Sequence, residues 1–263
     1  MSFAPDWLAL REPADHAARD AALLRQAAQV AVAAAGAAGA PAPVIVDLGA
    51  GTGSTARAMA PHLPAGTRWR FVDNDPALLG LAVARTGPDA VAHRGDLADL
   101  AALPLEGAHL VTASALFDLM SRDWLAALAD RLAQAGIGVY AALSYDGRMI
   151  WDPALPADAA ITTAFNRHQQ TDKGLGPALG PEAGTVAADL LAEAGFIVAT
   201  APSPWVLEAE GGAALQAELC AGIAEAAAEA GAADAADWGA ARRTAAAGTR
   251  CEIGHMDLLA LPR

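Results

Sequence analysis

The sequence predicts one α/β domain built on a mainly parallel β-sheet. The chain has 263 residues, a length that suits a single domain better than two full ones. Short apolar runs of strand length alternate with helical stretches, which is typical of βαβ units. A glycine-rich turn, Gly49–Gly53, directly follows the first of these apolar runs.

Seven apolar runs are predicted to be strands. They are Val44–Leu48, Arg68–Asp73, Val91–Arg94, Leu110–Ser114, Gly138–Ser144, Phe196–Ala201 and Cys251–Leu261. The predicted helices are Asp15–Ala35, Gly53–Ala60, one that begins at Pro76, Trp124–Ala135, Glu182–Ala194, Ala213–Ala230 and Ala235–Ala247. Asp75 is a suitable N-cap for the helix that starts with Pro76. Val44–Leu48 is mostly apolar, as expected of a strand buried on both faces.

We expect residues 1–263 to form a single domain with a core and a lid. The core is expected at about 40–144, 181–204 and 249–263, and the lid elements at about 1–35, 145–180 and 205–248. Residues 145–180 are rich in proline, glycine and polar side chains, which predicts irregular structure there. The two insertions are long for simple loops, and this length favours a lid over the site.

Composition argues against several classes of partner. The net charge is −13, and the 17 basic residues are scattered, so neither nucleic acid nor an anionic membrane surface is expected as a partner. The most apolar window, Ala27–Val46, is interrupted by glycine and proline, which disfavours a membrane helix. Two cysteines, Cys220 and Cys251, provide no disulfide framework, and Met1–Leu10 does not read as a signal peptide. The expected location is therefore cytoplasmic.

A strand, closely spaced glycines and a helix together predict a nucleotide-binding turn, because glycine allows close approach of the backbone to a ligand. The dinucleotide pattern G-x-G-x-x-G fails, because Ser54 occupies its sixth position. No Gly-Lys-Ser/Thr sequence occurs, which removes the phosphate-binding P-loop. A nicotinamide-dependent oxidoreductase remains an alternative function.

Three segments carry a family resemblance. Asp47-Leu-Gly-Ala-Gly-Thr-Gly53 resembles motif I of the class I S-adenosylmethionine-dependent methyltransferases, and Phe71–Leu79 and Gly95–Leu97 resemble the next two motifs of that family. The resemblance extends over about residues 44–144, with a further match at Glu193–Phe196. It implies a Rossmann-like, seven-stranded sheet with an antiparallel last strand, helices on both faces and a small helical lid. It also implies S-adenosylmethionine as cofactor.

The same resemblance implies roles for individual residues. Asp47 would orient the glycine turn or meet the methionine end of the cofactor, and Asp73 would hold the ribose hydroxyls. The other residues implied in cofactor binding are Gly49, Ala50, Gly51, Gly53, Asn74, Asp96, Leu97 and Ser114. Asp96 and Leu97 would lie near the adenine, and Ser114 would border the site of methyl transfer.

The expected reaction is methyl transfer to a small-molecule acceptor on oxygen, with nitrogen and carbon as alternatives. Asp118 and His168 are the candidate catalytic residues, each as a general base. Further polar or aromatic candidates for the acceptor pocket are Tyr145, Trp151, Asn166, Arg167, Gln169 and Lys173, and a weaker group is Trp7, Arg11 and Arg19. The six histidines show no metal-ligand spacing, so no metal site is predicted. A non-catalytic protein that binds the same cofactor remains a further alternative.

Overall fold

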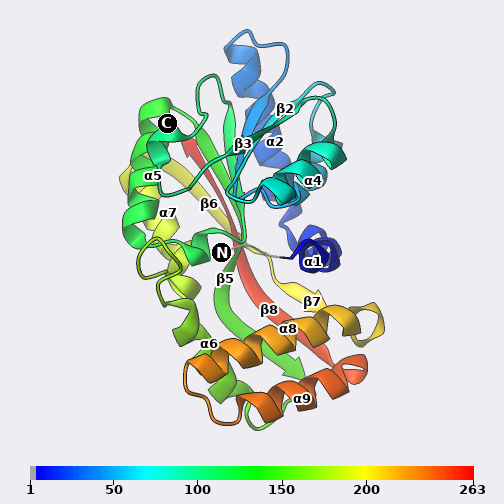
Figure 1. Ribbon diagram of the computed structural model, residues 1–263. Coiled ribbons are helices and arrows are strands. Elements are labelled where there is room, and N and C mark those ends of the chain that lie inside the picture. The colour runs from blue at the N-terminus through cyan, green and yellow to red at the C-terminus, as the bar shows by residue number, and fades with distance from the viewer. Residues whose placement is uncertain (1–3) are drawn as a thin grey trace.

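The computed structural model describes residues 4–263 as a twisted sheet of eight strands with helices on both faces (Figure 1). Its strand order is β3-β2-β1-β4-β5-β8-β6, and β7 pairs with β8 alone. The strands are β1 (Val44–Leu48), β2 (Arg68–Asp73), β3 (Ala90–Arg94), β4 (Leu110–Ser114), β5 (Gly138–Asp152), β6 (Phe196–Pro202), β7 (Trp205–Leu207) and β8 (Arg250–Pro262). The predicted fold class is confirmed, including the antiparallel last strand, which pairs with both β5 and β6. The short β7 is an eighth strand beyond the seven predicted.

Helices cover both faces of the sheet, and β1 is therefore buried on both sides. Ile45 packs into a cluster with helices α2 (Ala21–Ala37), α3 (Ser54–Met59) and α4 (Pro76–Thr86), whereas Val46 packs into a separate cluster with α5 (Arg122–Ala135) and α7 (Ala183–Glu193). Successive residues of a strand point to opposite faces, so one apolar run supplies both cores. This arrangement leaves the carboxyl ends of β1, β2 and β4 at one edge of the sheet.

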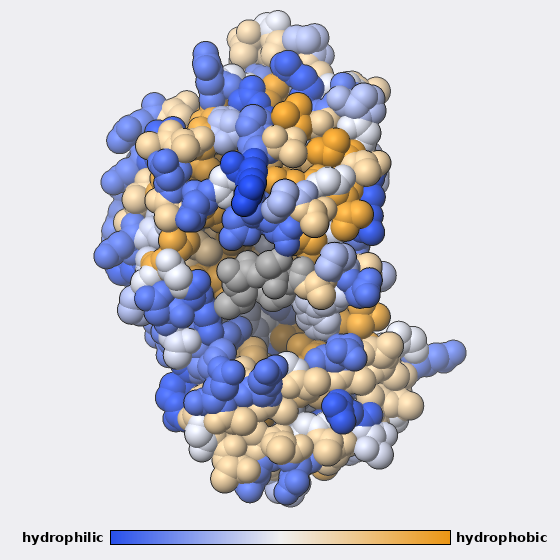
Figure 2. Space-filling view, viewed as in Figure 1, coloured by the Kyte–Doolittle hydropathy of each residue, from blue (hydrophilic) through white to orange (hydrophobic). Residues whose placement is uncertain are grey.

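Strands β5 and β8 extend beyond the sheet into a second lobe (Figure 1). This lobe contains β7, α6 (Asp158–Gln169), α8 (Ala209–Glu229) and α9 (Ala235–Ala245) around its own apolar cluster, which includes Trp151, Trp205 and Trp238. Figure 2 shows much of the surface of α8 and α9 in pale orange, the colour of their many alanines, whereas the upper lobe mixes blue with patches of deeper orange.

The predicted irregular stretch 145–180 is wrong in two places. Strand β5 continues to Asp152, because after a register shift between Tyr145 and Met149 it pairs again with β8. Residues 158–169 form helix α6, whose Ile161 and Ala164 are buried in the second lobe. The antiparallel partner β8, about 100 residues further along the chain, provides the pairing that the local sequence does not reveal.

The predicted helix Asp15–Ala35 is two helices. Helix α1 (Pro5–Ala18) ends before Arg19, which is extended with φ −54° and ψ 136°. The Asp20 carboxylate accepts hydrogen bonds from the amides of Ala22 and Leu23, and so caps the start of α2. None of the helices in residues 4–263 is both long and apolar enough to cross a membrane. The residues Met1–Phe3, considered above for a targeting signal, lie outside the described part of the chain.

Candidate functional site

A cavity of about 340 Å³ lies at the carboxyl ends of β1, β2 and β4, where open α/β sheets bind their ligands. The glycine turn and the ends of β2 and β3 form one wall. Helix α1 forms the cover, and the segment after β4 together with residues 173–175 forms the far wall. Of the residues implied in cofactor binding, seven line the cavity: Gly49, Gly51, Asp73, Asn74, Asp96, Leu97 and Ser114. Asp47, Ala50 and Gly53 lie behind them.

The glycine turn takes a shape that only glycine adopts without strain. Gly49 has φ 62°, and a Cβ atom there would lie 3.1 Å from Leu116 Cδ1. Gly53 has φ 79° and ends the turn as the N-cap of α3. The Ala50 amide donates to the carbonyl of Val72 at 3.1 Å, which fastens the turn to β2. Ala50 and Gly53 therefore shape the turn, while Gly49 and Gly51 face the cavity.

Asp73 links the glycine turn to the end of β2. Its Oδ2 accepts the amide of Gly51 at 2.9 Å, and its Oδ1 accepts the amide of Asp75 at 3.0 Å. A carboxylate offers about four lone-pair sites, so two remain for a ligand. On the neighbouring strand end, the Leu97 carbonyl accepts Trp124 Nε1 at 2.7 Å, and this bond fixes the backbone that faces the cavity.

Asp47 lies below the turn and is 1% exposed. Its Oδ1 accepts Thr112 Oγ1 at 2.7 Å, and its Oδ2 has no hydrogen-bond partner in the described part of the chain. Burial raises the pKa of Asp47 to about 7. The structure thus places Asp47 as a buried support for the turn rather than on the cavity wall.

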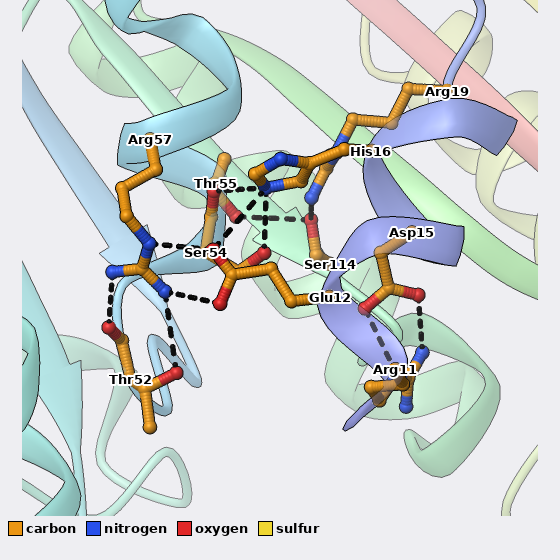
Figure 3. Close-up of polar contacts among 10 residues, drawn as sticks. All are labelled: Arg11, Glu12, Asp15, His16, Arg19, Thr52, Ser54, Thr55, Arg57 and Ser114. Carbon is orange, nitrogen blue, oxygen red and sulfur yellow. Dashed lines mark hydrogen bonds and ion pairs between the residues drawn. The ribbon is translucent and has the colours of Figure 1, made fainter. Parts of the chain in front are cut away.

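Helix α1 is fastened over the glycine turn by ionic and polar contacts (Figure 3). Glu12 accepts two hydrogen bonds from Arg57, from Nε at 2.6 Å and from Nη2 at 2.7 Å. Arg57 Nη1 also donates to the Thr52 carbonyl at 2.7 Å. His16 Nε2 lies 3.1 Å from both the carbonyl and the hydroxyl oxygen of Ser54. The helix therefore closes the cavity from above.

Arg19 extends from the end of α1 to the end of β4 (Figure 3). Its Nη2 donates to Ser114 Oγ at 2.8 Å, and that hydroxyl lies 3.1 Å from Thr55 Oγ1. Arg19 is 5% exposed and lines the cavity, yet its Nε and Nη1 have no partner among residues 4–263. Buried guanidinium groups are normally paired with anions, so these two donors indicate a site for one. Sequence analysis places Arg19 only in the weaker group of candidates, because the residue it contacts is 95 positions away.

Arg11, on α1, also lines the cavity, and its charge is paired with Asp15. Its Nε and Nη2 donate to the Asp15 carboxylate at 2.9 and 3.0 Å. The indole Nε1 of Trp205 donates to the same carboxylate at 3.0 Å, and the guanidinium lies 4.9 Å from the Trp205 ring centroid. This cluster fixes α1 to β7 of the second lobe.

The two candidate bases do not line the cavity themselves. Asp118 is 7% exposed in the 3-10 turn Phe117–Leu119, and its Oδ1 has no partner in the described chain. Burial raises the pKa of Asp118 to about 6, whereas its chain neighbours Leu119 and Met120 reach the cavity. His168 lies on α6, where Nε2 is 2.9 Å from Glu229 Oε2 and Nδ1 is 3.3 Å from Lys173 Nζ. Lys173 lines the cavity, so His168 contacts a residue of the cavity wall without lining the cavity itself.

Apart from Lys173, the remaining acceptor candidates do not line the cavity; they are Trp7, Tyr145, Trp151, Asn166, Arg167 and Gln169. Tyr145 donates to Asn166 Oδ1 at 2.7 Å in the second lobe, and Trp151 packs edge-on against Trp238. Arg167 donates to the carbonyl of Ala230, away from the cavity. Across residues 4–263, no three histidine, cysteine or acidic side chains are grouped so as to hold a metal ion.

Comparison with known proteins agrees with this geometry. Residues 45–136 match the model of a family described as "Methyltransferase domain". No curated protein matches the sequence. A Bacillus halodurans C-125 protein described as a methyltransferase has a similar structure, with a TM-score of 0.51 and 14% identity over 92% of this chain and 96% of that one.

Two further solved structures have a similar fold, with lower TM-scores. A chain of the complex between the Haloferax volcanii Trm112 methyltransferase activator and its methyltransferase partner gives a TM-score of 0.50 and 17% identity, over 98% of this chain and 94% of that one. Human N-acetylserotonin methyltransferase, solved with S-adenosylmethionine, gives 0.44 and 19% identity over 74% of this chain. This chain spans about half of that protein, 48% of its length. Residues 45–136 therefore resemble a methyltransferase domain, and the similarity of fold to a solved structure extends over most of the chain.

Proposed function

We propose that this protein is a class I methyltransferase, that it binds S-adenosylmethionine in the cavity beneath α1, and that it transfers the methyl group to an oxygen of a small-molecule acceptor. The observation that carries the proposal is Arg19, a buried guanidinium that has two donors without partners beside the glycine turn. A methionine carboxylate placed there would satisfy both donors. The cavity volume of about 340 Å³ lies within the range of small-molecule sites.

The adenosine half of the donor fits the opposite end of the cavity. Asp73 keeps two lone-pair sites after it has accepted the amides of Gly51 and Asp75, and these sites suit the two ribose hydroxyls. Asp96 and Leu97 line the cavity beyond it and are the residues we assign to the adenine. The donor would then extend from the ends of β2 and β3 to Arg19 at the end of β4.

Bound S-adenosylmethionine supplies a methyl carbon made electrophilic by its positively charged sulfur. The protein then needs mainly to hold the acceptor in line, for which oriented reactions show effective molarities of roughly 10⁵ M or more. A hydroxyl acceptor must also lose its proton. Asp118, which is buried beside the wall residues Leu119 and Met120, is the base we assign to that step. Its Oδ1 has no hydrogen-bond partner in the described chain, and burial raises its pKa to about 6, so its carboxylate is available near neutral pH.

Charge and enclosure favour a small acceptor. The chain carries a net charge of −13, which repels nucleic acid, and α1 covers the cavity through the Glu12–Arg57 pair. We place the acceptor between the core and the segments expected to form the lid, α1 and the loop that holds Lys173. Binding of a polymer would require a more open surface.

Calorimetry with S-adenosylmethionine and S-adenosylhomocysteine tests the donor site, with NADH as the control ligand. We expect saturable binding of both sulfur ligands and none of NADH. Transfer of radiolabelled methyl from the donor to a pool of hydroxylated metabolites then tests the reaction. Binding without transfer to any pool would make the protein a non-catalytic binder of the cofactor, and binding of NADH alone would make it an oxidoreductase.

A further inference from the structure

Lys173 is the only lysine in the chain, and it lines the cavity. We propose that the methyl acceptor carries an oxyanion, a carboxylate or a phosphate, which Lys173 binds while His168 and Glu229 hold the lysine in position. The inference rests on the proposed function, because it concerns the acceptor end of the same cavity.

The position of Lys173 assigns it to the acceptor end. The donor residues lie over β1, β2 and β3, whereas the loop of Lys173 is fastened beyond β4. The Leu179 amide donates to the Met120 carbonyl at 2.9 Å, and the Asp172 carboxylate accepts the amide of Gly174 at 2.7 Å. In Figure 1 this yellow-green loop and α1 lie on opposite sides of the sheet's carboxyl end. A molecule between them would face both walls.

The charge of Lys173 is not balanced within the described chain. Its one polar contact there is His168 Nδ1 at 3.3 Å, and no carboxylate lies within ion-pair distance of its Nζ. Burial lowers the pKa of Lys173, and the attraction of the Glu229 carboxylate, which lies beyond ion-pair distance, offsets only part of this effect. Of the other cations on the wall, Arg11 is paired with Asp15, and Arg19 is assigned to the donor carboxylate. Lys173 is thus the cation left for the acceptor.

His168 is placed to orient the lysine. Its Nε2 lies 2.9 Å from the Glu229 carboxylate, which accepts a proton and does not donate one. We therefore assign the ring proton to Nε2, which leaves Nδ1 as the acceptor for the Lys173 ammonium. His168 comes from α6 and Glu229 from α8, so two helices of the second lobe set the direction of one side chain. His168 and Glu229 act as positioning residues.

The wall around Lys173 describes the rest of the acceptor. Leu119, Met120 and Leu175 line the cavity beside it, and each offers an apolar surface. An anion without an apolar body would leave this surface in contact with water. The chain's net charge of −13 also repels anions at long range, so a local cation is needed to hold one. The ligand class is therefore a small organic acid.

The single lysine makes a direct test possible. Protein labelled with ¹³C at the lysine ε-carbon gives one lysine resonance, and this resonance is titrated with benzoate, phenyl phosphate and the neutral control benzamide, each with and without S-adenosylhomocysteine. We expect benzoate or phenyl phosphate to shift the resonance saturably and to raise its pKa, and the stronger of the two identifies the anion. A resonance that neither anion moves, or that benzamide moves equally, would overturn the proposal.

Variants separate positioning from folding. His168→Ala should weaken binding of the effective anion by about tenfold, the scale of a charge-assisted hydrogen bond. His168→Gln keeps an acceptor oxygen and should retain most of the affinity. Arg167→Gln, the neighbouring cation outside the cavity, is the matched control and should change nothing. An equal loss in His168→Gln and Arg167→Gln would contradict the assigned role.

Calorimetry on the same samples distinguishes failure of the proposed donor site from failure of the proposed acceptor site. Failure to bind S-adenosylhomocysteine rejects the donor site. A lysine resonance that does not respond to the anions in protein loaded with S-adenosylhomocysteine rejects the acceptor site alone.

Discussion

Replacement of Arg19 by methionine should weaken the binding of the donor's methionine carboxylate and leave the binding of its adenosine unchanged. Arg19 has two buried donors without partners, and a carboxylate bound to a cationic donor contributes about 1.5–3 kcal/mol. The dissociation constant of S-adenosylhomocysteine should therefore rise by about 10- to 150-fold. Because the side chain is only 5% exposed, salt should screen this attraction weakly.

The assay compares two ligands that differ in the relevant group. 5′-Methylthioadenosine has the same adenosine and a thioether but no carboxylate, so calorimetry should find its affinity unchanged in Arg19→Met. Methionine replaces an unpaired buried charge by an apolar chain, so the melting temperature without ligand should not fall. Arg25→Met, at an exposed position of α2, is the matched control. An equal loss for both ligands, or no loss for either, would refute the carboxylate assignment.

Three further predictions concern the rest of the site. Asp73→Asn should weaken the binding of S-adenosylhomocysteine and of 5′-methylthioadenosine equally, by about 1.5–3 kcal/mol in calorimetry, because both ligands carry the ribose. A loss of affinity for only one of them would contradict the ribose role. Because burial raises the pKa of Asp118 to about 6, its carboxylate forms as the pH rises through that value, so kcat/KM should increase over this range in the wild type. Asp118→Asn should lose that increase and about 10²–10⁴-fold in rate, and an unchanged profile would remove Asp118 as the base. Glu12→Gln removes the pair with Arg57 and should speed release of S-adenosylhomocysteine in stopped-flow measurements, whereas an unaltered release rate would show that α1 does not limit exit.

The stability of the protein should also depend on the ionisation of Asp118. Its pKa is raised in the folded state, so the folded protein binds this proton more tightly than the unfolded chain. The free energy of unfolding should therefore fall as the pH rises from 3.8, the ordinary pKa of an aspartate, to about 6. Urea titrations across this range measure the slope. Asp118→Asn should flatten it, and an identical slope in the variant would assign the effect to other groups.

The donor side could be predicted because its signals are local in the sequence. Gly49, Gly51 and Gly53 mark a turn that requires positive φ, and the run from Phe71 to Asp73 marks the next strand end. Parallel neighbouring strands bring their carboxyl ends to one edge, so the two segments had to meet. The sheet, its order of elements and the residues at its edge followed from these patterns.

The acceptor side could not be predicted in the same way, because its contacts are distant in the sequence. Arg19, in the weaker group of candidates, became significant only when its contact with Ser114 was known. The sequence did name Lys173 as a candidate for the acceptor pocket, but only the structure separates it from Arg167, because Lys173 lines the cavity and Arg167 does not. The continuation of β5 to Asp152 depends on β8, and a strand formed by remote pairing shows little local signal. The sequence could name His168 as a candidate, but its distance from the cavity wall depends on how α6 packs against α8.

The contacts of α1 and the residues after it also determine when the site can be completed. Asp15 binds Trp205, 190 positions later, and the Asp20 amide donates to Asp257, 237 positions later. During synthesis the glycine turn and β2 can form early, but the helix that covers them gains its contacts with Trp205 and Asp257 only after β7 and β8 have left the ribosome. Contacts of such long sequence separation form late and slowly. A growing chain would therefore acquire its cofactor pocket as one of its last folding steps, so that ligand binding by stalled intermediates would report how much of the chain has been made.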